Sequence, residues 1–393
     1  MPFAMSGTGP SLENNEKRTE MMRNYKYLLR PSKKQDQMLD FLLWQERIIY
    51  NAALEKRIRM YQETGKSLNY MSQWVFIRDL HRQHPDTFGL LNVNSLNRLL
   101  RRLDQAYAGF FRRVKAHDKK VGFPKFKSRR TFTSMEYVYG NGCKLRVREG
   151  RTRFYIQNVG EIRMCYHRPV PTEAKIKCAL ISRNGARWYV ILMIELPDPQ
   201  PEPRPPLVIG IDVGLKSILT CSNGLSVGNP HWLGASLVRL RILNRQASRR
   251  QDGSNRKKTA YAQVSRMYAK IANQRRDFYH KATRSFVDNY SLIAIEDLPM
   301  AFMNANEFLG KPSYDAGLGT FRRFLEYKAQ AAGVQVVAVS PYNTSQRCSG
   351  CGELVPKNLD TRIHDCPHCG LVLDRDVNAA RNILQAALAQ VNQ

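Results

Sequence analysis

The chain has 393 residues, 43% of them hydrophobic, and its 62 Lys and Arg outnumber 33 Asp and Glu to give a formal charge of +29. This length predicts two or three domains, and the charge predicts a polyanionic partner such as nucleic acid, because so large an excess otherwise repels itself. No apolar run reaches the ~18 residues of a membrane span, and residues 1–18 lack the apolar core of a signal peptide. We therefore exclude membrane and secreted classes and expect a cytosolic or nucleoid-associated protein with no membrane partner.

The N-terminal part of the chain predicts a tail, a short strand and a helical domain. Residues 1–22 are polar and predict a disordered tail. Alternating apolar residues predict a strand within 23–33 that is ended by Pro31. Residues 34–118 follow the helical period and predict three or four helices, the last capped by Asn94 or Ser95. Two apolar stripes carry this prediction: Met38, Leu42, Gln45, Ile49 and Ala52, then Leu96, Leu99, Leu100, Leu103, Tyr107, Phe110 and Phe111.

A basic segment follows these helices. Residues 101–130 hold eleven Lys and Arg against two acids, and Phe123 and Phe126 are interleaved with the charges near its end. Such a segment can pair phosphates and stack bases; the alternative is an ordinary basic loop pinned by two buried Phe. We favour nucleic-acid contact, with the following candidates: Lys125, Lys127, Arg129 and Arg130.

Residues 119–198 change to a period of two, which predicts a small antiparallel barrel or sandwich. The expected strands are 134–139, 144–148, 153–156, 162–166, 176–182 and 188–196. The early strand at 25–30 is expected to pair into this sheet, which makes the helical domain an insertion. Six prolines between Pro197 and Pro206 then predict a stiff linker at 199–206.

The C-terminal half predicts an α/β nuclease-like domain over 207–342 that is completed by a helix within 373–393. Two buried strands each end in an acid, Asp212 and Glu296, and Asp376 begins the last helix. A strand-end acid alone is usually a solvated turn residue. Three of them, in an order of elements that fits an RNase H-like fold, predict an oxygen-ligand site for two Mg²⁺ or Mn²⁺ ions that cleave phosphodiesters. A long basic helical stretch at 236–290 lies between the two strands.

Paired cysteines interrupt this domain at 343–372. Cys348 and Cys351 form one Cys-x2-Cys pair, Cys366 and Cys369 form the other, and 14 residues separate the pairs. This spacing predicts one structural Zn²⁺ ion held by four thiolates with no open position; the alternative is four free core cysteines. His364 and His368 are not needed as ligands, and we expect both at the surface or against nucleic acid.

Five segments of the chain resemble the TnpB family of transposon-encoded RNA-guided nucleases, from which the Cas12 effectors of type V CRISPR systems descend. The matching segments are Gly122–Phe126, Gly210–Lys216, Ile295–Leu298, Ser340–Gly352 and Asp374–Asn382. The resemblance covers about residues 23–385.

The resemblance implies a multidomain α+β fold: a wedge β-barrel with an inserted helical recognition domain, then a RuvC domain that carries a zinc-bearing target-binding insertion. It implies a prokaryotic protein with an ωRNA guide, a monomer in the RNA complex, that cuts double-stranded DNA beside a short transposon-associated motif (TAM). Carried over by residue, the catalytic triad falls on Asp212, Glu296 and Asp376. Tyr70 and Asn97 align with the family's TAM readers, and Arg347 is a further nucleic-acid-binding candidate.

Two alternatives to an RNA-guided endonuclease remain from the residues. A DNA-joining transposase uses the same kind of metal pair on the same kind of fold. A non-catalytic RNA-guided repressor or binder needs the charge but not the acids, and the presence of all three acids argues against it.

Overall fold

The computed structural model describes residues 21–118, 121–197, 205–297, 315–358 and 361–392. It divides into two compact units, residues 1–198 and residues 199–393. The tail predicted for residues 1–20 and most of the predicted proline linker lie outside the described residues. Among the described residues, no helix is long and apolar enough to cross a membrane.

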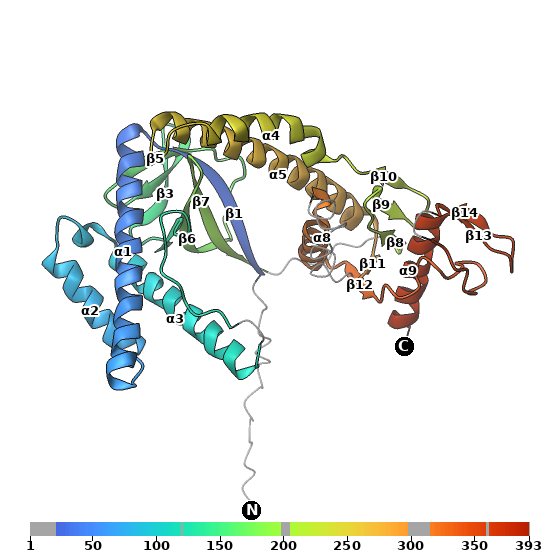
Figure 1. Cartoon of the computed structure of the whole chain (residues 1–393), viewed down its shortest axis with the longest axis horizontal. Coiled ribbons are helices and arrows are strands. Elements are labelled where there is room, and N and C mark those ends of the chain that lie inside the picture. Colours follow the sequence, from blue (N-terminus) through green and yellow to red (C-terminus); the bar gives the residue numbers. More distant parts are fainter. Residues whose placement is uncertain (1–20, 119–120, 198–204, 298–314, 359–360, 393) are drawn as a thin grey trace, which may run out of the picture. The chain divides into compact units, whose positions relative to one another are not determined.

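The first unit contains one seven-stranded curled antiparallel sheet (Figure 1), with its strands in the order β2-β6-β7-β1-β5-β4-β3. The bounds are β1 Met21–Arg30, β2 Ser134–Val138, β3 Cys143–Arg148, β4 Arg151–Ile156, β5 Gly160–Met164, β6 Lys175–Asn184 and β7 Arg187–Leu196. The early strand does pair into the sheet: β1 runs antiparallel to β7 from Met21↔Leu196 to Leu29↔Trp188. It is longer than predicted and begins inside the expected tail, because each residue from Met21 to Leu29 has a ladder partner on β7.

The helices of this unit are α1 (Lys33–Thr64), α2 (Tyr70–Gln83), the short 3-10 helix η1 (Phe88–Leu90) and α3 (Val93–Lys115). The three or four predicted helices are therefore confirmed. The predicted cap of α3 is wrong: Asn92 is the N-cap and accepts from the backbone of Asn94 and Ser95. Ala53, rather than Ala52, is the buried alanine of α1. Helices and sheet share one apolar core.

The second unit contains a five-stranded mixed sheet in the order β10-β9-β8-β11-β12. Its strands are β8 (Val208–Asp212), β9 (Ser217–Cys221), β10 (Ser226–Gly228), β11 (Leu292–Glu296) and β12 (Gln335–Val339). The central strands are continuous apolar runs because both faces are covered: β8 and β11 are parallel, as are β11 and β12.

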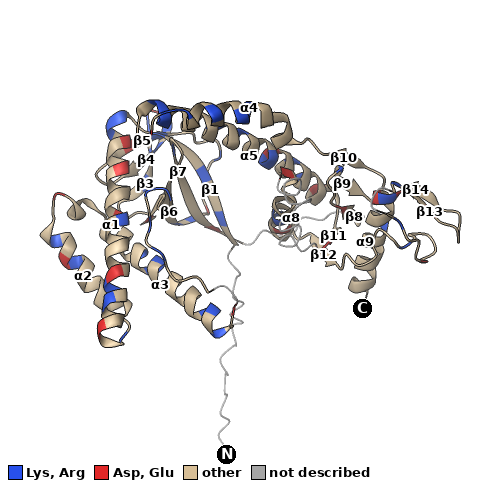
Figure 2. Cartoon of the chain, viewed as in Figure 1, with Lys and Arg blue, Asp and Glu red and all other residues tan. Residues whose placement is uncertain are grey.

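Helices of the second unit pack on this sheet. They are α4 (Trp232–Ser248), α5 (Asn255–Asn289), α8 (Leu318–Ala332) and α9 (Arg375–Val391). The stretch predicted as one helical region is two helices, broken by the turn residues at 249–254. Figure 2 shows Lys and Arg distributed along both α4 and α5. A two-stranded ribbon, β13 (Ile363–Asp365) with β14 (Val372–Asp374), leads into α9.

Candidate active site and cysteine cluster

Two of the predicted acids end neighbouring parallel strands. Ile211 of β8 is paired in register with Ile295 of β11, so Asp212 and Glu296 follow at the same edge of the sheet. The apolar strands before them are buried, and this burial fixes both carboxylates at the sheet edge.

The third acid comes from the first turn of α9. Asp374 is the N-cap of this helix, and its Oδ1 accepts from the backbone N–H groups of Asp376 and Val377. Asp376 is therefore the aspartate of the pair whose carboxylate is not the cap. Its helix approaches β8 so closely that Gly210 is needed: a Cβ there would lie 2.1 Å from the carbonyl oxygen of Ala380.

Two of the three acids act electrostatically on the third. Burial, with smaller contributions from the charges of Glu296 and Asp376, raises the pKa of Asp212 to about 8; the N–H of Val213 opposes the rise. Burial also raises the pKa of Glu296, which the Thr344 hydroxyl partly opposes. Burial and the neighbouring Asp374 raise the pKa of Asp376. An acid whose ionisation is hindered by two neighbouring acids fits a site that binds cations, because a cation reverses this cost.

The donor set suits a hard cation such as Mg²⁺ or Mn²⁺, since all three side chains offer oxygen. Their carboxylate oxygens do not all lie within 4.8 Å of one another. Over the part of the chain that the structure describes, the four cysteines are the only group of three or more potential ligands that meets that distance.

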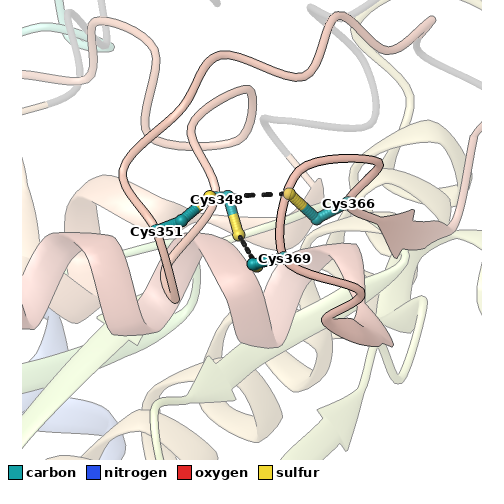
Figure 3. A group of neighbouring side chains, drawn as sticks. All are labelled: Cys348, Cys351, Cys366 and Cys369. Carbon is teal, nitrogen blue, oxygen red and sulfur yellow. Dashed lines mark hydrogen bonds between the residues drawn. The ribbon is translucent and has the colours of Figure 1, made fainter.

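The four cysteines converge on one point (Figure 3). The Sγ atoms of Cys348 and Cys369 are 3.6 Å apart, as are those of Cys351 and Cys366. Sulfurs that share a tetrahedral Zn²⁺ at ~2.3 Å lie ~3.8 Å from one another. Burial raises the pKa of the Cys348 thiol, but the N–H groups of Cys351 and Gly350, together with the side chains of Cys366 and Cys369, outweigh it and lower that pKa to about 7. The pKa of Cys366 is lowered as well, whereas the neighbouring thiols raise the pKa of Cys351 and Cys369. The four sulfurs can together hold a metal ion.

The segment that carries these cysteines, residues 343–372, is called the finger below. Two amide side chains of α9 bind it through hydrogen bonds. Asn378 accepts from the N–H of Ser349 and donates to the carbonyl of Arg347. Asn382 donates to the carbonyls of Thr344 and Arg347. Nothing in the local sequence singles out Thr344 as a contact of the acids. Asn378 and Asn382 are four residues apart and therefore share a helix face, which is the sequence signal for a common binding role.

One histidine prediction is wrong. His364 is fully buried, whereas His368 is exposed as expected. The Nδ1 atom of His364 lies 2.7 Å from Nζ of Lys357. Burial and Lys357 both lower the pKa of His364, and the neighbouring Cys366 opposes them. The ribbon of β13 and β14 places this side chain inside the finger, so it is not available for contact with nucleic acid.

The candidate nucleic-acid contacts differ in their surroundings. In the first unit, the Tyr70 hydroxyl donates to Asn97 Oδ1 at 2.6 Å, so the two positions aligned with TAM readers touch each other. In the second unit, Arg347 is exposed but donates to the carbonyl of Gly352, within the first cysteine turn.

The basic segment of the first unit presents its charges to solvent. Its exposed candidates are Lys125, Arg129 and Arg130. The backbone of Lys127 is held by Asn51, which exchanges two hydrogen bonds with it. Phe123 and Phe126 are 44% and 55% exposed, so they are not the buried pins of an ordinary loop.

Three family models match the chain: a helix-turn-helix domain of the OrfB IS605 type at residues 21–66, the probable transposase OrfB IS605 at 191–307, and a Cas12f1-like TNB domain at 319–383. A protein of Streptomyces pristinaespiralis named "Putative RNA-guided DNA endonuclease" is 32% identical over 382 residues, which cover 94% of this chain and 90% of that protein. The chain belongs to the TnpB family. InsQ of Escherichia coli (strain K12), with the same description, is 28% identical over 94% of this chain and 93% of its own.

Solved structures with this fold include a Cas12f1–sgRNA–target DNA complex, with a TM-score of 0.55 and 17% identity over 90% of this chain and 83% of that one. The mini-RNA-guided endonuclease CRISPR-Cas_phi3 gives a TM-score of 0.51 with 10% identity over 94% of this chain and 92% of its own. At these identities, the likeness concerns the fold.

Proposed function

We propose that this TnpB family member is an RNA-guided DNA endonuclease. The observation that carries the proposal is that Asp212 and Glu296 end neighbouring parallel strands at one sheet edge, and that the charges of Glu296 and Asp376 both raise the pKa of Asp212. The alternative of a non-catalytic binder gives no reason to keep three partly buried acids together. The relatives named as endonucleases supply the reaction class.

In this proposal, the second unit is a RuvC domain with an RNase H-like sheet. Asp212, Glu296 and Asp376 would hold two Mg²⁺ or Mn²⁺ ions, which supply activation of water and stabilisation of the leaving oxygen in phosphodiester hydrolysis. The chain itself would hold the carboxylates in place. Parallel strands position Asp212 and Glu296, and α9, which is capped by Asp374, positions Asp376.

The four cysteines would hold one structural Zn²⁺, since four thiolates leave no open position for chemistry. The finger at 343–372 would then bind target nucleic acid beside the catalytic acids, because its segment from Thr344 to Ser349 is anchored on the helix that carries Asp376.

The first unit would be the wedge sheet with its recognition helices and would bind the guide RNA and the TAM. The exposed basic segment with Phe123 and Phe126 supports this role. Guide pairing would read the target sequence, while the protein reads a short flank. The complex would contain one copy of the chain and act in the prokaryotic cytoplasm on double-stranded DNA.

The test is cleavage by the protein purified with its own RNA, which is sequenced to identify the guide. We expect Mg²⁺-dependent cutting of a matched DNA that is abolished by Asp212→Ala. The matched control is Asp374→Ser, which keeps a capping oxygen and the helix start and is expected to cut normally. Cutting that survives Asp212→Ala, or products in which DNA ends are joined, would overturn the proposal; joined products would favour a transposase.

A further inference from the structure

The Thr344 side chain contacts one of the three acids directly. The Thr344 hydroxyl, on the segment between β12 and the first cysteine pair, donates to Oε1 of Glu296 at 2.5 Å. The Pro341 carbonyl is a second acceptor at 3.2 Å. A hydroxyl has one proton to donate, and a carboxylate at the shorter distance is the stronger acceptor. Thr344 is 8% exposed, so water does not readily take its place.

The position of Thr344 is itself fixed from α9. Asn382, which is 7% exposed, donates to the carbonyl of Thr344 at 2.8 Å and to that of Arg347 at 2.7 Å. One turn earlier, Asn378 binds both Arg347 and Ser349. The backbone that carries Thr344 is therefore tied to the helix whose first turn carries Asp376.

A hydrogen bond of this kind has a specific consequence for Glu296. The last torsion of a glutamate side chain is broad and has no steep preference of its own. A donor on Oε1 limits that torsion and leaves the second oxygen to act as a ligand. Partners of this type orient ligating carboxylates in metal sites.

We propose that Thr344 is a positioning residue for Glu296, and that Asn382 holds Thr344 in place, so that the seat of the finger and the acid site are one connected unit. This inference rests on the proposed function in one respect: it takes Glu296 to be a cation ligand. It also explains why the finger is inserted directly after β12, next to the strand that ends in Glu296.

Two substitutions separate the hydroxyl from the shape of the side chain. Thr344→Val keeps the shape and removes the donor, whereas Thr344→Ser keeps the donor and removes a methyl group. We expect Thr344→Val to lower the cleavage turnover of the RNA complex by about ten- to a hundredfold with little change in target DNA binding. Thr344→Ser is expected to stay within a few-fold of the wild type.

A second readout does not depend on cleavage. Mn²⁺ is titrated into the full RNA-free chain, its binding is followed by electron paramagnetic resonance, and the binding that persists in Asp212→Ala is subtracted as background. We expect Thr344→Val to weaken the site-specific Mn²⁺ binding by a similar factor and Thr344→Ser to retain it. Thermal melting and zinc content, measured on the same samples, report whether each variant is folded.

The outcomes are distinct. Thr344→Val that binds Mn²⁺ and cuts like the wild type overturns the inference while leaving the proposed function intact. Folded Thr344→Ser that is as impaired as Thr344→Val also overturns it, because the hydroxyl would then not be the deciding group. A wild-type complex that does not cut matched DNA contradicts the proposed function instead, and the Mn²⁺ titration still tests the role of Thr344.

Discussion

Gly210→Ala is a small perturbation with a large expected effect on the second unit. Gly210 lies in the middle of β8, two residues before Asp212, and α9 crosses directly over it. An alanine Cβ would lie 2.1 Å from the carbonyl oxygen of Ala380 and 2.9 Å from Cβ of Leu384, whereas real Cβ contacts essentially never fall below 3.0 Å. The difference from 2.1 to 3.0 Å requires α9 or β8 to move by about 0.9 Å.

This shift has two costs. Overpacking of a well-packed core costs ~1–3 kcal/mol, and the lower entropy of the unfolded alanine chain returns only ~0.4–1 kcal/mol. We therefore expect the free energy of unfolding to fall by about 1 kcal/mol. The second cost concerns Asp376, because it stands on the helix that must move. A displacement of ~1 Å in a catalytic group can lower turnover by ~100-fold.

The assays are urea unfolding of the full chain and cleavage turnover of its RNA complex. Gly228→Ala is the matched control, because Gly228 lies in the same sheet and an added Cβ there meets no atom within 4 Å. The control is expected to match or slightly exceed the wild type in stability and to cut normally. The reasoning is refuted if Gly210→Ala unfolds at the wild-type midpoint and cuts at the wild-type rate.

Three further predictions concern separate parts of the chain. Burial is the main cause that raises the pKa of Glu46 from 4.5 to about 7, so the free energy of unfolding falls by about 3 kcal/mol as pH rises through that window. Glu46→Gln keeps an acceptor for Ser95 and does not ionise, so in urea unfolding its stability relative to the wild type should rise by that amount between pH 4.5 and 8. A stability difference that does not change with pH would refute this. Cys348→Ser should lower bound zinc from about one equivalent to near zero and destabilise the second unit, and full zinc retention on elemental analysis with normal stability would contradict four-thiolate binding. Lys125→Ala should weaken guide RNA binding and reduce the slope of log affinity against log salt by ~1, whereas an unchanged slope would remove Lys125 from the phosphate contacts.

Local patterns in the sequence are sufficient to predict most strands and helices, the two acids at strand ends and the group of four cysteines. A period of two gave the strands of the first unit to within a few residues, because their alternation reflects one buried face. The apolar runs that end in Asp212 and Glu296 marked two buried parallel strands, since such runs are what a doubly covered sheet requires. The spacing of the cysteines indicated a metal cluster, because two short turns are enough to place four sulfurs together.

The tertiary structure decided what depends on contacts between distant residues. The burial of His364 follows from the pairing of β13 with β14, and the sequence around it resembles any polar loop. Asp374, and not Asp376, caps α9, a distinction of backbone geometry that two neighbouring aspartates do not reveal. Glu296 meets Thr344 across 48 residues, and Gly210 meets Ala380 across an even longer stretch. Such contacts are set by packing, so only the folded chain shows that the finger and the acids share one support.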